Sequence, residues 1–156
     1  MSVETTAVAS GEKTATTTAA AMMHLSVPIH DVDQASHFYE HVLGCDITRR
    51  QSDRLDIDFF GHHLVAQLSA TESAHRSINI GKDQYPLRHY GVIVQPPVYD
   101  RLLSRLIEAN VPFAMQPTRL FEGTPREQLV FLVKDPSGNA LEVKGMMDPN
   151  HVFSAL

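Results

Sequence analysis

Nine histidines among 156 residues invite a search for metal-binding positions. Two of them, His24 and His89, each open a stretch with strand-like alternation, and they are 65 residues apart (89 − 24 = 65). Glu142 lies in the last such stretch, between Leu141 and Val143, and so points to the opposite face from these two apolar side chains. Two imidazoles and one carboxylate on a common face would hold a divalent metal and leave about three positions open on it. The alternative interpretation is that the histidines are ordinary strand residues and Glu142 is a surface carboxylate.

Two similar series of elements are predicted to position these residues. In the first, residues 22–29 alternate as a strand, and a helix begins at Asp31 and stops at Gly44. Three extended runs follow, at residues 45–50, 55–60 and 62–69. A long polar loop is expected over residues 70–86.

The second series repeats the order of the first. Residues 87–94 read as a strand, and Pro96 and Pro97 open a helix that ends at Asn110. Three extended runs follow again, at residues 112–116, 127–133 and 139–144. The order predicts an α+β protein built of two tandem βαβββ modules.

The chain is expected to hold one domain over residues 22–150, with modules at 22–83 and 87–146. Residues 1–21 are rich in Thr, Ala and Ser, lack hydrophobic periodicity and have none of the features of a secretory signal. They are therefore predicted to form a disordered leader. Residues 147–156 are expected to form a C-terminal tail.

The composition excludes several classes of function. With 43% hydrophobic and 20% charged residues, the chain is an ordinary globular protein. Its formal charge of −5 and its lack of clustered Lys and Arg argue against nucleic acid or an anionic membrane as partner. No apolar run is long enough for a transmembrane helix. The lone cysteine, Cys45, cannot form an intramolecular disulfide, which favours the reducing cytoplasm.

Two further motifs accompany the two strand-opening histidines: the pattern Asp33-x-Ala35-x-x-Phe38-Tyr39-x-x-x-Leu43-Gly44 and the segment Asp135-Pro136-Ser137-Gly138-Asn139-Ala140-Leu141-Glu142. Taken together, these motifs resemble those of the vicinal oxygen chelate superfamily, which includes glyoxalase I, extradiol dioxygenases, methylmalonyl-CoA epimerase, fosfomycin-resistance transferases and bleomycin-binding proteins. The resemblance covers roughly residues 22–146. It implies that the paired modules close an eight-stranded, U-shaped sheet around a metal.

The resemblance also implies a ligand set. His24, His89 and Glu142 occupy the positions of the metal ligands in the superfamily. Fe(II) is the metal most often held by two histidines and one carboxylate, and Mn(II), Ni(II), Co(II) or Zn(II) would fit the same donors.

The fourth coordination position divides the superfamily. Glyoxalase I has a second Glu there, which this sequence lacks, and methylmalonyl-CoA epimerase has a Gln that Gln67 would match. Extradiol dioxygenases leave the position without a ligand, in which case Gln67 is a cavity wall. His63, expected on the same face, is predicted to act as a general base or to form a hydrogen bond to an oxygen intermediate. Candidates for substrate contacts are Tyr90, Arg119 and Gln128.

Three classes of function remain. The first is a metal-dependent oxygenase acting on a catechol or related enediol, and the second is a metal-dependent isomerase, epimerase or lyase. The third is a protein that sequesters a ligand without catalysis, which is disfavoured because such relatives lack the metal ligands. In each case the partner is a small molecule, and a homodimer is expected because the open sheet edges need cover.

Overall fold

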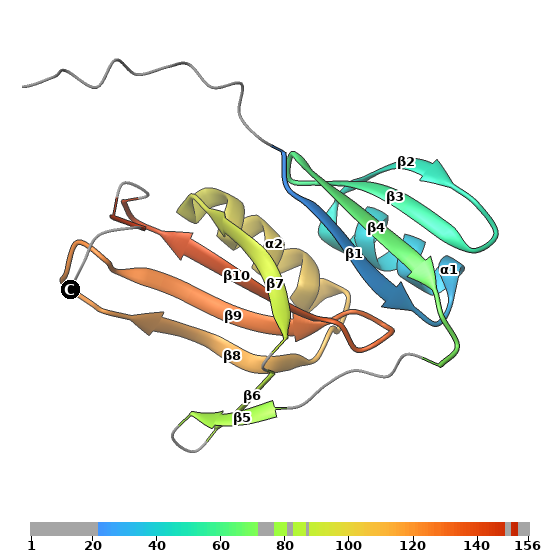
Figure 1. Ribbon diagram of the computed structural model, residues 1–156. Coiled ribbons are helices and arrows are strands. Elements are labelled where there is room, and N and C mark those ends of the chain that lie inside the picture. The colour runs from blue at the N-terminus through green and yellow to red at the C-terminus, as the bar shows by residue number, and fades with distance from the viewer. Residues whose placement is uncertain (1–21, 72–76, 81–82, 87, 149–150, 153–156) are drawn as a thin grey trace, which may run out of the picture.

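The computed structural model in Figure 1 describes residues 22–71, 77–80, 83–86, 88–148 and 151–152. The leader predicted for residues 1–21 lies outside the described residues. Of the described helices, none is long and apolar enough to cross a membrane.

Two βαβββ series follow each other along the chain, as predicted. The first consists of β1 (His24–Ile29), α1 (Val32–Ser36), η1 (His37–Leu43), β2 (Asp46–Arg50), β3 (Arg54–Phe59) and β4 (His62–Leu68). The second consists of β7 (His89–Val94), α2 (Pro96–Glu108), β8 (Phe113–Leu120), β9 (Gln128–Lys134) and β10 (Ala140–Met146). The first helix begins as expected, since Asp31 accepts a hydrogen bond from the Gln34 N–H (2.8 Å), and it ends at Gly44 with φ of +78°.

A short pair of strands corrects the prediction of a loop over residues 70–86. β5 (Ser77–Ile80) and β6 (Asp83–Pro86) form a two-stranded antiparallel sheet between the two series. The sequence signal was the alternation of Ile78 and Ile80 with polar neighbours, a strand pattern only four residues long.

The eight strands of the two series form two four-stranded sheets rather than one hydrogen-bonded sheet. Their orders are β1-β4-β3-β2 and β7-β10-β9-β8, so that β1 and β7 each lie at an edge. β1 contains Pro28, which has no N–H to donate, and the Pro28 carbonyl accepts a hydrogen bond from Asn139 Nδ2 (2.7 Å). A side chain of the second module thus bonds to β1 where a neighbouring strand would otherwise continue the ladder.

Both sheets turn one face toward the helices, and these faces share a single core (Figure 1). In this core Phe59 of the first module packs against Tyr39, with ring centroids 6.5 Å apart, and against Tyr90 of the second module, at 5.7 Å. The α+β class and the tandem modules predicted from the sequence are confirmed. The remaining face of each sheet carries His24 and His63 in the first module and His89 and Glu142 in the second.

A buried chain of hydroxyl groups crosses the core between the modules. The Tyr39 hydroxyl donates to Asp135 Oδ2 (2.9 Å) and accepts a hydrogen bond from the Tyr90 hydroxyl. Burial, followed by the neighbouring Tyr90 and Asp135, raises the pKa of Tyr39 well above its ordinary value, so the phenol keeps its proton. Among the described residues, the Tyr99 hydroxyl differs because it is buried without a hydrogen-bond partner.

This contrast predicts that Tyr39→Phe and Tyr99→Phe have different effects on stability. Removing the Tyr39 hydroxyl leaves Tyr90 and Asp135 each short of one partner, which should lower the free energy of unfolding by about 1–3 kcal/mol. Removing the Tyr99 hydroxyl breaks no hydrogen bond and should change it by less than about 0.5 kcal/mol. Urea unfolding followed by circular dichroism measures both, and equal losses would contradict the assignment.

Candidate functional site

The three predicted metal ligands and His63 lie in two clusters, one on each sheet. In the first cluster, His24 and His63 are direct neighbours in the parallel register of β1 and β4. Their Nδ1 atoms lie 2.9 Å apart, within hydrogen-bond distance, and their ring centroids 4.8 Å apart. His63 Nε2 faces Asp56 Oδ1 of β3 at 3.9 Å. Three adjacent strands thus place two imidazoles and a carboxylate side by side.

Asp56 was not among the residues predicted from the sequence. It is only 4% exposed and forms ion pairs with Arg54 Nε (2.6 Å) and Arg49 Nε (3.2 Å). The signal that could have found it is its place between Leu55 and Ile57, both buried in the core. The same alternation marked the carboxylate of the last strand.

The contacts of the first cluster fit one set of imidazole tautomers. Where two ring nitrogens meet, one must carry the proton and the other must accept it. The Asp56 carboxylate favours a proton on His63 Nε2, so that His63 Nδ1 accepts from the Nδ1–H of His24. His24 then presents an unprotonated Nε2, the form in which a histidine coordinates a metal.

His89 and Glu142 form the second cluster, on β7 and β10. His89 Nδ1 donates to the carbonyl oxygen of Pro86 (3.0 Å), and His89 Nε2 lies 3.6 Å from Glu142 Oε2. Lys144 Nζ lies 3.1 Å from the same Oε2. The backbones approach closely here, because a Cβ on Gly91 would lie only 1.7 Å from the Glu142 carbonyl oxygen. Any larger residue at position 91 would displace the strand that carries the carboxylate.

The second cluster fits a divalent metal in donor type and comes close to one in spacing. Two ligands bound at about 2.1 Å to one metal lie roughly 3.0–3.4 Å apart, and the His89 and Glu142 atoms, 3.6 Å apart, need to approach each other only slightly. A backbone carbonyl on the other ring nitrogen is also the usual support of a metal-binding histidine.

His24 is separate from this pair. β1 contacts the second module at the end opposite His24, where the His30 N–H donates to Ser137 Oγ (2.9 Å). The six-residue strand separates His24 from this end by roughly 17 Å. Among the described residues, no three His, Cys, Asp or Glu side chains lie close enough together to hold a metal ion. One chain therefore brings together two of the three predicted ligands.

The register identifies the counterpart of Glu142 in the first sheet. In the second sheet, the residue two positions after His89 is paired with Glu142. In the first sheet, the residue two positions after His24 is paired with Val65. Val65 is 4% exposed and has no donor atom for a metal. Gln67, the next residue on this face, donates to a backbone carbonyl in the β2–β3 turn (3.2 Å). The first sheet therefore has no carboxylate at the position equivalent to Glu142.

The three candidates for substrate contacts lie in different places. Tyr90 takes part in the buried hydroxyl chain, which leaves its ring at the border of a hollow beside His89. Arg119 forms an ion pair with Glu127. Gln128 opens β9 and is paired with the last residue of β10. Their proposed substrate contacts stay predictions.

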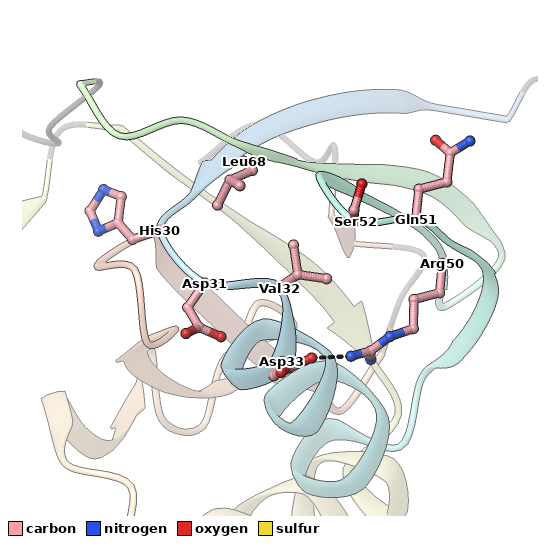
Figure 2. Close-up of a pocket in the computed structure, with 8 residues that line it drawn as sticks. All are labelled: His30, Asp31, Val32, Asp33, Arg50, Gln51, Ser52 and Leu68. Atoms are coloured by element: carbon pink, nitrogen blue, oxygen red, sulfur yellow. Dashed lines mark hydrogen bonds and ion pairs between the residues drawn. The ribbon is translucent and has the colours of Figure 1, made fainter.

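His89 lines two of the hollows in the described part of the chain. One, of about 330 Å³, lies between β1 and the start of β7 and is lined by residues 25–28, 88–90, 139 and 140. The other, of about 250 Å³, runs along β7 and is lined by residues 89–93, Glu142 and Lys144. A larger hollow of about 550 Å³, shown in Figure 2, lies at the start of α1, where Arg50 and Asp33 form an ion pair. None of the predicted site residues lines this third hollow.

Comparison with known proteins identifies the class to which this fold and this site belong. The chain is a member of the Glyoxalase/Bleomycin resistance protein/Dioxygenase superfamily, whose family model matches residues 21–143. A glyoxalase/bleomycin resistance protein/dioxygenase from Alicyclobacillus acidocaldarius is 34% identical, with a TM-score of 0.72, over 88% of this chain and 100% of that one. No curated protein matches the chain.

Two more distant structures share the fold alone. Lactoylglutathione lyase from Agrobacterium tumefaciens is 18% identical, with a TM-score of 0.57, over 81% of this chain and 93% of that one. The fosfomycin resistance protein FosX from Listeria monocytogenes is 12% identical, with a TM-score of 0.60, over 82% and 94%. The resemblance drawn from the sequence is confirmed, and the superfamily spans several chemistries.

The tautomers inferred for the first cluster lead to a spectroscopic prediction. In the wild-type protein, His24 should carry its neutral-state proton on Nδ1, as seen in long-range ¹H–¹⁵N correlation spectra. His63→Phe removes the acceptor and should shift His24 toward the tautomer mixture of a solvated imidazole. His62→Phe is the matched control, because His62 instead accepts from the Met23 N–H (3.3 Å). An Nε2–H tautomer of His24 in the wild-type protein would contradict the inferred chain of hydrogen bonds.

Proposed function

We propose that this protein is a metal-dependent enzyme that acts on a small substrate with two adjacent oxygens. His89 and Glu142 hold the metal, and His24 is the third ligand. The observation that carries the proposal is the His89–Glu142 pair, whose donor atoms lie 3.6 Å apart on two hydrogen-bonded strands. The Pro86 carbonyl supports the pair, because it holds His89 Nδ1 and so orients Nε2.

The donor set determines what chemistry a metal would supply here. Two imidazoles and one carboxylate leave about three positions for the substrate oxygens and a further ligand, and they favour Fe(II), with Mn(II), Ni(II), Co(II) or Zn(II) as alternatives. Val65 at the position equivalent to Glu142 supports an open site, since it supplies no fourth ligand. The Nδ1 atom of His63 forms a hydrogen bond with Nδ1 of His24. The role of His63 as a general base stays a prediction.

A homodimer would complete the ligand set. Within one chain His24 and the His89–Glu142 pair belong to different sheets, and both β1 and β7 are edge strands that a second copy could cover. We therefore propose that His24 of one copy meets His89 and Glu142 of another. A small-molecule partner and a cytoplasmic setting, which the lone cysteine favours, belong to the same proposal.

The ligand assignment predicts about one divalent metal per chain in protein expressed in metal-supplemented medium. His24→Ala and Glu142→Ala should each bring the metal content close to zero, because each removes one of three ligands, while circular dichroism shows folded protein. His62→Ala removes a neighbouring imidazole outside the ligand set and should leave the metal content unchanged. Elemental analysis measures all four proteins, and full metal content in both ligand variants would show that the assignment is wrong.

Mixing the two ligand variants tests whether the site is shared between copies. A His24→Ala chain paired with a Glu142→Ala chain would contain one intact site, since the remaining His24 meets the remaining Glu142 across the interface. Coexpression should therefore restore part of the metal content that each variant lacks alone, and light scattering should give the mass of a dimer. A monomer at micromolar concentration, or a mixture without metal, would contradict the shared site.

The candidate types of reaction can be distinguished by whether they need oxygen. The single carboxylate among the ligands and the apolar Val65 favour the oxygenase class, so Fe(II)-loaded protein should consume oxygen when offered catechols. An isomerase or lyase would instead turn over a hemithioacetal or a 2-methylmalonyl-type thioester under argon, with Zn(II) or Ni(II) as well. Binding of aromatic ligands without turnover under any metal would favour a sequestering protein.

A further inference from the structure

Two lysines lie on the face of the second sheet that carries Glu142, although the protein as a whole has a formal charge of −5. On this face β9 presents Lys134 and β10 presents Lys144, as their register and alternation require. Glu142 is the acidic residue that β7, β9 and β10 place there. On this face, the side chains of these three strands thus carry two positive charges and one negative charge, even before any metal binds.

Lys144 is the closer of the two lysines to the proposed metal pair. Its Nζ lies 3.1 Å from Glu142 Oε2, and its side chain, 33% exposed, lines the hollow of about 250 Å³ that runs along β7. His89 Nε2 faces the same carboxylate oxygen at 3.6 Å. The counterpart of Lys144 in the first sheet is Gln67, an uncharged residue that bonds to its own chain. The charge at this position is thus particular to the second sheet.

An ammonium group beside a divalent metal is unfavourable unless an anion lies between them. Without a metal, the Glu142 carboxylate is neutralised by Lys144. A metal bound to Glu142 would be partly neutralised by the same carboxylate, so the metal ion and the Lys144 ammonium group would lie within a few ångströms of each other and repel. A ligand with an anionic group would relieve this repulsion and form a charge-assisted hydrogen bond with Lys144. The hollow beside Lys144 offers the space for such a group.

We propose that Lys144 forms an oxyanion subsite next to the metal position, so that the natural substrate carries a carboxylate or phosphate group close to its pair of adjacent oxygens. This inference rests on the proposed metal-dependent function and names the class of substrate for it. Lys144 binds the charged group, while His24, His89 and Glu142 serve the metal.

The first test compares two ligands that differ by one carboxylate, catechol and 3,4-dihydroxybenzoate, on Zn(II)-loaded protein by titration calorimetry. The wild-type protein should prefer the carboxylate, and Lys144→Met should reduce this preference by about tenfold while leaving the affinity for catechol within about twofold. Lys144→Arg should keep the preference, and so should Lys134→Met, the control that removes a lysine from the same face. An unchanged preference in Lys144→Met would overturn the proposal.

The second test needs no metal and so separates this inference from the proposed function. Glu142→Gln removes the carboxylate that occupies Lys144, and the metal-free variant should bind an oxyanion in its place. Benzoate and inorganic phosphate are the two probes, and their binding is followed through the NMR signals of the Lys144 side chain. The probe that binds more tightly shows whether the subsite prefers a carboxylate or a phosphate. Binding should be lost in the double variant Glu142→Gln/Lys144→Met. If neither probe shifts the Lys144 signals, the subsite is wrong, whereas failure of the wild-type protein to bind metal would count against the proposed function alone.

Discussion

The carboxylate of Asp135 is buried at the junction of the two modules, and donors from both of them satisfy it. It accepts hydrogen bonds from the backbone of Ser137 and Asn139 (2.9 and 2.8 Å), from the Asn139 side chain (2.7 Å) and from the Tyr39 hydroxyl (2.9 Å). Asn139 also bonds to the Pro28 carbonyl of β1. Because a buried carboxylate without these partners would be strongly unfavourable, the turn before β10 has one conformation and one position against the first module. The positions of Glu142 and Lys144, a few residues further along β10, follow from it.

Much of the fold could be predicted because its determinants are local in the sequence. The alternation of His63 with Leu64 places one on the open face and the other in the core, and Asp31 and Gly44 delimit the first helical region. The motif residues also identified the superfamily correctly. The strands β5 and β6 were missed because a run of four residues carries too little periodicity to distinguish it from a loop.

The site was harder to predict because its geometry depends on distances between sheets. Alternation shows that His24, His89 and Glu142 each point away from the helices, yet it contains no information on how far one sheet lies from the other. The contacts that organise each cluster, Asp56 behind His63 and the Pro86 carbonyl behind His89, come from strands paired over many residues. Comparison of the two registers then distinguishes the halves, since one sheet has a carboxylate where the other has a valine.

The parallel pairing of the first and last strands in each module has a consequence for the order of folding. His24 and His63 are 39 residues apart in the sequence, and His89 and its partner Ala140 are 51 apart (140 − 89 = 51), whereas β3 and β4 meet through a tight turn. Closing a long loop costs more chain entropy than forming a hairpin. The antiparallel strands should therefore form first, and β1 and β7 should join them late. Both histidines proposed as metal ligands open these late strands. A folding intermediate would therefore have most of its core before it could bind a metal, and a ligand-binding signal would report on the last step of folding.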